Sequence, residues 1–328
     1  MKSKGHNIRR MVLFLASLFL MPAVLFAQDF PRRPVNILVS LAPGGITDGT
    51  IRLLANKAEK FLGQPIVITN NGGGGGSVAY GIIAKEKPDG YHLLGGPSTP
   101  VARMPHFRTV PYKFEDFTFV MHCGAPITGL VVRAESPWKT LKDFVEYTKK
   151  NPWKMTYATL GIGSPHHMAM EYIAKKEEMQ WTMVPYPGGA PAVTALLGGH
   201  VGAFSGGTVW IPHVKEGTLR LLATYGEKRM KTFPQVPTLR ELGYEYIDET
   251  VILITAPKGT PPAIVKKLDD AFRKVIDDPE FIGYLEKTET QPSYRNSEDT
   301  KKYLEEAYHR IGKMVIELKI PREEEKKP

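Results

Sequence analysis

Three glycine-rich stretches carry the residues best suited to bind a ligand. They read APGGITD at residues 42–48, GGGGGS at 72–77 and GIGSPHH at 161–167. Each stretch follows an apolar run typical of a strand and opens a segment with helical periodicity. The first turn of a helix has unpaired N–H groups and a partial positive charge, so it attracts anions. We therefore expect three strand-to-helix turns that can bind an anionic ligand.

The five consecutive glycines at 72–76 are also typical of a flexible linker. A linker should separate domains, yet this run lies between a strand pattern at 66–69 and a helix pattern at 77–85. Glycine adopts positive φ and lets a ligand or another backbone come close, and Ser77 is a suitable N-cap for the helix. We predict a turn at the end of a parallel sheet, where open α/β folds bind ligands; a mobile loop tip is the alternative.

The residue types in these turns favour a carboxylate over a phosphate. None of the turns ends in the Lys-Ser/Thr pair of a nucleotide-binding loop, and their spacing differs from the dinucleotide fingerprint. A carboxylate has two oxygens, which backbone amides can meet without a lysine. The hydroxyls of Thr47 and Ser164 would add donors, and Asp48 is expected to cap or brace the first helix.

Catalysis and metal binding are alternatives for the residues near the third turn. Ser164 and His167 suggest a hydrolase, but Gly-x-Gly-Ser is not the Gly-x-Ser-x-Gly elbow, and no Asp is evidently placed to orient a base. His167 and Glu171 are four residues apart, so they could share a helix face and a metal. A hydrogen bond at the helix start is the favoured role for the histidine, and we expect no catalytic residue, metal or cofactor.

Four single side chains have both a structural and a chemical interpretation. Tyr186, Phe204 and Trp210 would suit an apolar pocket for an aromatic acid, but each is also typical of a core. Cys123 is the only cysteine, so the chain has no internal disulfide framework. Its apolar neighbours favour a buried, inert thiol over a nucleophile.

These residues are positioned by a repeating order of strand, loop and helix. Strand patterns occupy 35–39, 66–69, 127–132, 155–159, 182–184, 219–224 and 251–254, and helix patterns occupy 51–61, 77–85, 141–150, 168–176, 263–276 and 297–318. Gly63 follows the first helix and is expected to end it. Strands that alternate with helices predict βαβ units, and hence an α/β fold with mostly parallel sheets.

The N-terminus has the three-part organisation of a secretory signal. Basic residues between Lys2 and Arg10 precede a charge-free apolar run at 11–26, and Ala27 precedes a polar segment. Because the run is short for a membrane span, we predict a signal peptide at 1–27 that is cleaved near Ala27, with an uncleaved anchor as the alternative. The mature chain of roughly 300 residues is long enough for two domains, and we expect it to be periplasmic.

The charge distribution argues against a nucleic-acid partner. The full chain has 43 Lys and Arg residues against 34 Asp and Glu residues. Four of the basic residues lie in the predicted signal, which leaves the mature chain with 39 against 34, a net charge of +5. This charge is spread along the chain without a basic block.

Many phrases of the sequence, in one order, resemble a known family. They include RPVNILVSLAPGGITDGTIRLLA, LGQPIVITNNGGGGG, LKDFVEYTKKNPWKMTYATLGIG, VPYPGGAPAVTALLGGHV and FPQVPTLRELGY. The family is that of the substrate-binding receptors of tripartite tricarboxylate transporters, also called Bug proteins. The resemblance covers nearly the whole mature chain.

The resemblance implies a two-lobe periplasmic binding protein of type II, with each lobe a mostly parallel sheet flanked by helices and a ligand cleft between the lobes. Residues 28–124 and 248–328 would form the first lobe, and 125–247 the second. It also implies that the chain is not an enzyme, that it binds a small carboxylate without a cofactor, and that its partners are the membrane permease subunits of a tripartite transporter. A hinged receptor is expected to be a monomer.

The resemblance also implies the binding residues, which would hold a carboxylate through backbone amides and bridging waters. In the first lobe they are Ala42, Pro43, Gly44, Gly45, Thr47, Asp48, Gly76, Ser77 and Ser98, and in the second lobe Leu160, Gly161, Gly163, Ser164, His167, Tyr186 and Gly206. A valine at Gly163 is expected to block the carboxylate.

Departures from the family pattern fall in the second lobe. Leu160 stands where members often have alanine, Pro187 where they often have lysine, and Gly202 where many have aspartate. We expect these changes to alter which chemical groups the site accepts at the end of the ligand away from the first carboxylate. Di- and tricarboxylates, aromatic acids, nicotinate-like acids and amino acids all remain candidates. Two alternative functions stay open at this stage: a ligand-loaded sensor for a membrane kinase, and a secreted hydrolase using Ser164 and His167.

Overall fold

The computed structural model describes residues 30–320 and 322, except 187, 248 and 249. The predicted signal peptide at 1–27 and its cleavage near Ala27 lie outside the described residues. Among the helices that are described, none is both long enough and apolar enough to cross a membrane.

The first lobe is built on a six-stranded sheet with the order β11-β4-β10-β3-β1-β2. Its strands are β1 (Val35–Val39), β2 (Ile66–Asn70), β3 (His92–Pro97), β4 (Phe117–Pro126), β10 (Ile252–Pro257) and β11 (Thr290–Arg295). The main helices on it are α3 (Ile46–Leu62), α4 (Ser77–Ile83), α10 (Pro262–Ile276) and α11 (Pro279–Lys287). A short helix, α5 (Thr99–Ala102), follows β3.

The second lobe is built on a five-stranded sheet with the order β7-β6-β8-β5-β9. Its strands are β5 (Gly129–Arg133), β6 (Thr156–Thr159), β7 (Thr182–Pro185), β8 (Ala203–Gly206) and β9 (Leu219–Thr224). Its helices are α6 (Leu141–Lys150), α7 (Pro165–Lys176), α8 (Gly189–Leu197) and α9 (Ile211–Lys215). Both sheets carry buried apolar clusters on their two faces.

Both sheets contain parallel and antiparallel strand pairs, whereas the sequence predicted mostly parallel sheets. Parallel pairing joins β1 to β2 and β3, and joins β6 to β7 and β8. The other pairs are antiparallel: β10 with β3 and β4, β11 with β4, and β5 with β8 and β9. The predicted two-lobe α/β architecture is confirmed.

The strand directions decide which ends of the sheets face each other. Strand β4 runs out of the first lobe and leads directly into β5 of the second. Since β10 is antiparallel to β4 and β3 is antiparallel to β10, β3 also ends toward the second lobe, as do β1 and β2. Strand β8 is antiparallel to β5, so β8, β6 and β7 end toward the first lobe. The carboxyl ends of β1, β2 and β3 and those of β6, β7 and β8 therefore border the space between the lobes.

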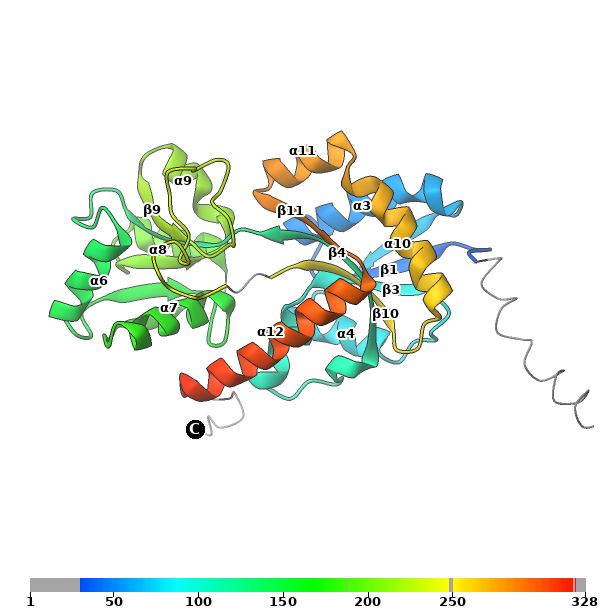
Figure 1. Cartoon of the computed structure of the whole chain (residues 1–328). Coiled ribbons are helices and arrows are strands. Elements are labelled where there is room, and N and C mark those ends of the chain that lie inside the picture. The colour runs from blue at the N-terminus through cyan, green and yellow to red at the C-terminus, as the bar shows by residue number, and fades with distance from the viewer. Residues whose placement is uncertain (1–29, 187, 248–249, 321, 323–328) are drawn as a thin grey trace, which may run out of the picture.

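A long C-terminal helix, α12 (Ser297–Glu317), links the two lobes. Ser297 at its start donates a hydrogen bond from its hydroxyl to the carbonyl of Phe119 in β4, at 2.6 Å. Farther along, Ile311 and Val315 are buried in the core of the second lobe. Figure 1 shows the helix running from the first lobe toward the second. Strand β4 of the first sheet runs to Pro126, two residues past the predicted boundary at 124, and the boundary at 248 lies outside the described residues, so the division into lobes at 124 and 248 stays a prediction. The distal half of α12 packs on the other lobe.

The single cysteine lies in the middle of the first sheet. Cys123 on β4 is fully buried, and burial raises the pKa of its thiol to about 12. The prediction that the thiol is buried is confirmed, and the raised pKa supports the prediction that it is inert.

Candidate ligand-binding site

The first-lobe turn, between β1 and α3, is exposed and leaves helix-start amides near its surface. Gly44 adopts φ +86°, in the left-handed region, and α3 begins at Ile46 after Gly45, which has no side chain to cap it. The amides of a first helical turn have no partner within the helix. A Cβ added at Gly44 would meet no atom within 4 Å. The turn therefore offers open space above the positive end of a long helix.

Asp48 holds this turn together. Its carboxylate accepts hydrogen bonds from the Gly44 amide at 2.9 Å, from Arg52 Nε at 3.0 Å and from Asn70 Nδ2 at 2.7 Å. Asn70 also donates to the carbonyl of Leu41, at 3.0 Å. Burial alone would raise the pKa of Asp48, but these hydrogen bonds outweigh it and keep the pKa below its ordinary value. The predicted bracing role is confirmed, and it occupies the amide of Gly44.

The glycine run is a compact 3₁₀ turn packed against its neighbours. Gly74, Gly75 and Gly76 all adopt positive φ. A Cβ at Gly72 would lie 3.0 Å from the backbone nitrogen of Ala42, so the second turn packs directly on the first. The N-cap prediction for Ser77 is wrong: Ser77 is the first residue of α4, and its hydroxyl donates to the carbonyl of Gly74 at 2.9 Å. The run needs glycine for backbone conformation and close packing, and it is no linker.

Ser98 lies at the same edge of the sheet, directly after β3. It is buried, and its hydroxyl accepts a hydrogen bond from the amide of Val251 at 3.1 Å. The amide of Ser98 donates in turn to the carbonyl of Val251, at 2.8 Å. These bonds tie the edge to the segment that returns from the second lobe.

The second-lobe turn, between β6 and α7, uses most of its own donors. Ser164 is the N-cap of α7, with its Oγ accepting from the His167 amide at 3.2 Å. The amide of Gly163 donates to His167 Nδ1 at 3.1 Å, and the amide of Ser164 donates to the carbonyl of Gly161 at 3.3 Å. The expectation that Gly163 offers its amide to a ligand is therefore wrong for this conformation. Gly161, with no atom within 4 Å of an added Cβ, is the open part of the turn.

Two first-lobe side chains reach the second-lobe turn. A Cβ at Gly163 would lie 2.7 Å from the ring of Phe107, and Arg103 Nη1 lies 3.5 Å from the Gly163 carbonyl. Burial lowers the pKa of Arg103 to about 10, which leaves it charged at neutral pH. Sequence reasoning missed both residues, because neither belongs to a motif and their contacts cross between lobes.

The hydrolase and metal hypotheses do not fit the geometry around His167. Because Nδ1 accepts from the Gly163 amide, it is not available to take a proton from Ser164. The other ring nitrogen, Nε2, lies 3.8 Å from Glu171 Oε1, and this oxygen accepts a hydrogen bond from the hydroxyl of Tyr157 at 2.9 Å. Within the described ranges, no group of three or more His, Cys, Asp or Glu residues is arranged to hold a metal.

The aromatic-pocket hypothesis is wrong for two of its three residues. Phe204 and Trp210 are fully buried in the core of the second lobe. Gly206 belongs to this core too, since its carbonyl accepts from Trp210 Nε1 at 3.2 Å and a Cβ there would overlap the Phe204 ring. Tyr186 is half-buried and packs against the outside of the cluster. Leu160 is 39% exposed.

The structure thus brings the predicted residues to two facing edges, although their exposure differs. The exposed ones are Ala42, Pro43, Gly44, Gly45 and Leu160; Gly161, Ser164 and Tyr186 are half-buried; Thr47, Asp48, Gly76, Ser77, Ser98, Gly163, His167 and Gly206 are buried. The exposed members are those a ligand would meet first, and the buried ones support the turns from behind.

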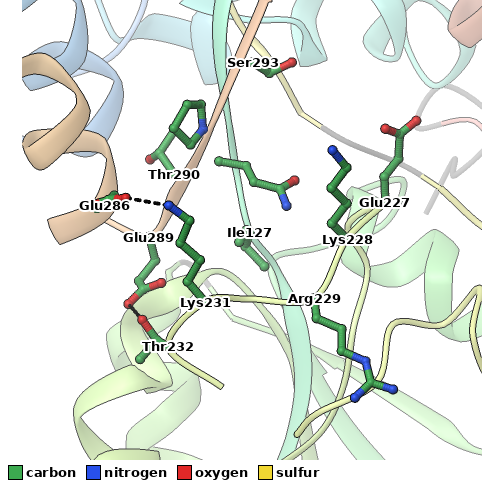
Figure 2. A pocket seen from close by; sticks show the side chains of 12 residues that line it. Ile127, Glu227, Lys228, Arg229, Lys231, Thr232, Glu286, Glu289, Thr290 and Ser293 are labelled. Carbon is green, nitrogen blue, oxygen red and sulfur yellow. Dashed lines mark hydrogen bonds and ion pairs between the residues drawn. The ribbon is translucent and has the colours of Figure 1, made fainter. Parts of the chain in front are cut away.

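A separate hollow of about 620 Å³ lies near β11, on the side of β4 and β10 away from the glycine turns. Figure 2 shows it between the end of α11, β11 and the segment after β9. An ion pair at 2.7 Å joins Lys231 of the second lobe to Glu286 of the first, and Thr232 donates to Glu289 nearby. In the sheet order, β4 and β10 separate this hollow from β3, β1 and β2. No predicted binding residue lines it.

The family is decided by comparison with known proteins. A family model described as the tripartite tricarboxylate transporter family receptor matches residues 50–320. The chain belongs to this family. Its members are substrate-binding receptors and not enzymes.

Similar proteins extend along almost the whole chain. A Cupriavidus necator protein, described as the UPF0065 protein in the gbd 5' region, is 39% identical over 298 residues, 90% of each chain. Protein BugT of Bordetella pertussis is 31% identical over 300 residues, 90% of this chain and 92% of BugT.

Solved structures are similar over the same length. MatC from Rhodopseudomonas palustris with bound malate has 29% identity and a TM-score of 0.71, covering 87% of this chain and 100% of MatC. R. palustris Rpa4515 with adipate has 27% identity and a TM-score of 0.76, covering 90% and 100%. A further similar structure, with 31% identity and a TM-score of 0.76 over 89% of this chain and 99% of its own, is described as a periplasmic transporter. These similarities support a periplasmic ligand-binding receptor.

Proposed function

We propose that the chain captures a small carboxylate between its lobes and delivers it to the membrane subunits of a tripartite tricarboxylate-type transporter. The observation that carries the proposal is the open first-lobe turn, where the first amides of α3 have no side-chain cap and an added Cβ at Gly44 would meet open space. The malate and adipate bound to two similar proteins support a carboxylate as ligand. The receptor would be exported, cleaved near Ala27 and monomeric.

Such a site can bind its ligand with useful affinity without a covalent step or a cofactor. A dissociation constant near the micromolar range corresponds to about 8 kcal/mol. A hydrogen bond to a charged group contributes about 1.5–3 kcal/mol, so a few amide contacts together with apolar contacts suffice. Because the ligand would touch both lobes, it would make more contacts when the lobes are closed than when they are open. It therefore stabilises the closed arrangement.

A substitution at Gly45 tests the site without disturbing the fold. Gly45 has φ −81° and ψ 170°, which valine adopts readily, and the nearest atom to an added Cβ is the Ala42 carbonyl oxygen at 4.0 Å. We expect Gly45→Val to cover the start of α3 and weaken carboxylate binding by at least about tenfold, the loss of one charge-assisted hydrogen bond. Calorimetric titration of refolded protein measures this loss.

The matched control is Gly283→Val, at an exposed position of α11 where an added Cβ meets no atom within 4 Å. Binding by this variant should equal that of the parent. Equal affinity in the parent and Gly45→Val would remove the first-lobe turn from the binding site.

A further inference from the structure

The two turns that face each other differ in the donors they keep available. On the first lobe, the starting amides of α3 have no partner within the helix. On the second lobe, the amides of Gly163, Ser164 and His167 all bond within the turn. The position after Ser164 is Pro165, which has no amide hydrogen. An anionic group is therefore met better by the first lobe than by the second.

The second-lobe edge instead presents apolar side chains. Leu160 after β6 is 39% exposed, and Val209 after β8 is 46% exposed. Tyr186 lies between β7 and α8, and its amide donates to the carbonyl of Thr159 at 2.8 Å, next to Leu160. Three neighbouring strands thus each place one large apolar or aromatic side chain at the same edge. Exposed apolar side chains gathered in this way are typical of a contact surface.

The residues that directly follow these three strands include no acid and no base before His166, at the start of α7. The three second-lobe segments, 160–164, 186–190 and 206–210, contain no Asp, Glu, Lys, Arg or His. Two first-lobe guanidinium groups are bonded to backbone carbonyls of the turns: Arg103 to that of Gly163, and Arg108 to that of Gly74. A second carboxylate placed against this edge would lose its hydration without gaining a cationic partner from these three segments.

We infer that the ligand is a monocarboxylate with an uncharged, largely apolar body, whose carboxylate lies at the start of α3 and whose body lies against Leu160, Tyr186 and Val209. The inference rests on the proposed function, since it assigns the ligand class of the same cleft. It distinguishes this chain from a receptor for dicarboxylates such as malate.

Pairs of acids with the same carbon skeleton test the inference. We would titrate refolded protein with hexanoate and adipate, and with benzoate and terephthalate, in a calorimeter. The monocarboxylate of at least one pair is expected to bind about tenfold or more tightly than its dicarboxylate, because the second carboxylate would be desolvated without a partner. Tighter binding of both dicarboxylates would overturn the inference and leave the proposed function intact. No binding of any acid would overturn both.

A charge introduced at the apolar edge gives a second test. Val209→Lys places an ammonium where a second carboxylate would lie, so we expect the ratio of monocarboxylate to dicarboxylate affinity to fall by about tenfold. The control is Leu197→Lys, since Leu197 is similarly exposed at 38% but lies at the far end of α8. An unchanged ratio in Val209→Lys, with normal thermal unfolding, would overturn the assignment of the ligand body to this edge.

Discussion

At the scale of single residues, Asp48 shows how the chain keeps an acid beside a proposed anion site. Asp48 is 3% exposed, and its carboxylate receives hydrogen bonds from Gly44, Arg52 and Asn70. The charge is therefore neutralised locally, and the turn between β1 and α3 is held in one conformation. The acid acts on binding through the backbone that it positions.

Asp48→Asn tests this role. An amide cannot accept all three hydrogen bonds, so we expect a loss of about 1–3 kcal/mol in the free energy of unfolding, measured by urea denaturation, and weaker carboxylate binding. Asp270→Asn is the control, because Asp270 pairs with Lys266 at the exposed surface of α10, and it should change stability by less than about 0.5 kcal/mol. Equal effects of the two substitutions would contradict the bracing role.

His122 predicts how stability depends on pH. It is fully buried, and its Nε2 accepts from Arg295 at 3.0 Å. Burial, and then the charge of Arg295, lower its pKa to about 3. As pH falls below the ordinary histidine pKa of about 6.5, the unfolded chain binds a proton that the folded chain does not, so stability falls by up to about 1.4 kcal/mol per pH unit.

His122→Asn removes this contribution. Between pH 7 and pH 5, the parent should lose about 2 kcal/mol more unfolding free energy than the variant. His200→Asn, at an exposed position, should follow the parent. Parallel pH profiles for the parent and His122→Asn would contradict the assignment.

At the scale of elements, Gly163 in the second-lobe turn has two structural roles that the sequence alone could not distinguish. Gly163 adopts φ +75°, and an added Cβ would lie 2.7 Å from the Phe107 ring of the other lobe. The glycine is therefore required for backbone conformation and also for packing between the lobes. A valine at this position would report on this packing rather than on a blocked carboxylate.

Two alanine substitutions separate these effects. Gly217 has nearly the same φ, +76°, but no atom within 4 Å of an added Cβ. Gly217→Ala should lower the unfolding free energy by about 1–2 kcal/mol through the left-handed backbone alone. Gly163→Ala should lower it further, by about 1–3 kcal/mol, because the methyl group also overpacks against Phe107. Equal losses in urea denaturation would show that the Phe107 contact carries no strain.

Local signals explain which elements the sequence predicted. Helix α3 ends at the glycine expected to stop it, since Gly63 adopts φ 78°, and the apolar periodicity of α10 and α12 matched their buried faces. Strand β11 was missed because it is largely polar and contains Pro292. The glycine turns were predictable because their conformation is local. The contacts of Arg103 and Phe107 with the second lobe were not, because they depend on how the lobes meet.

At the scale of the whole molecule, α12 restrains the relative positions of the lobes. Its first turn is bonded to β4, and Ile311, at 4% exposure, packs in the core of the other lobe. If the two lobes move toward each other, α12 must either stay in contact with both lobes or move together with the second lobe.

Ile311→Ala measures the contact. The lost side-chain volume should lower the unfolding free energy by about 2–5 kcal/mol. Ile316→Ala lies only five residues away on the same helix, but Ile316 is 79% exposed, so its effect should stay within about 0.5 kcal/mol. Similar values for the two variants in urea denaturation would contradict the role of α12 as a link between the lobes.

The central claim is that a carboxylate binds between the lobes, and thermal unfolding of the refolded chain tests it most directly. Refolding removes any ligand carried through purification. At a hundred times the dissociation constant, a ligand stabilises the folded protein by about 2.7 kcal/mol, which for a chain of this size raises the Tm by a few degrees. We predict such a shift with at least one carboxylic acid and none with the amide of the same acid. An equal shift with the amide, or no shift with any acid, would contradict the claim.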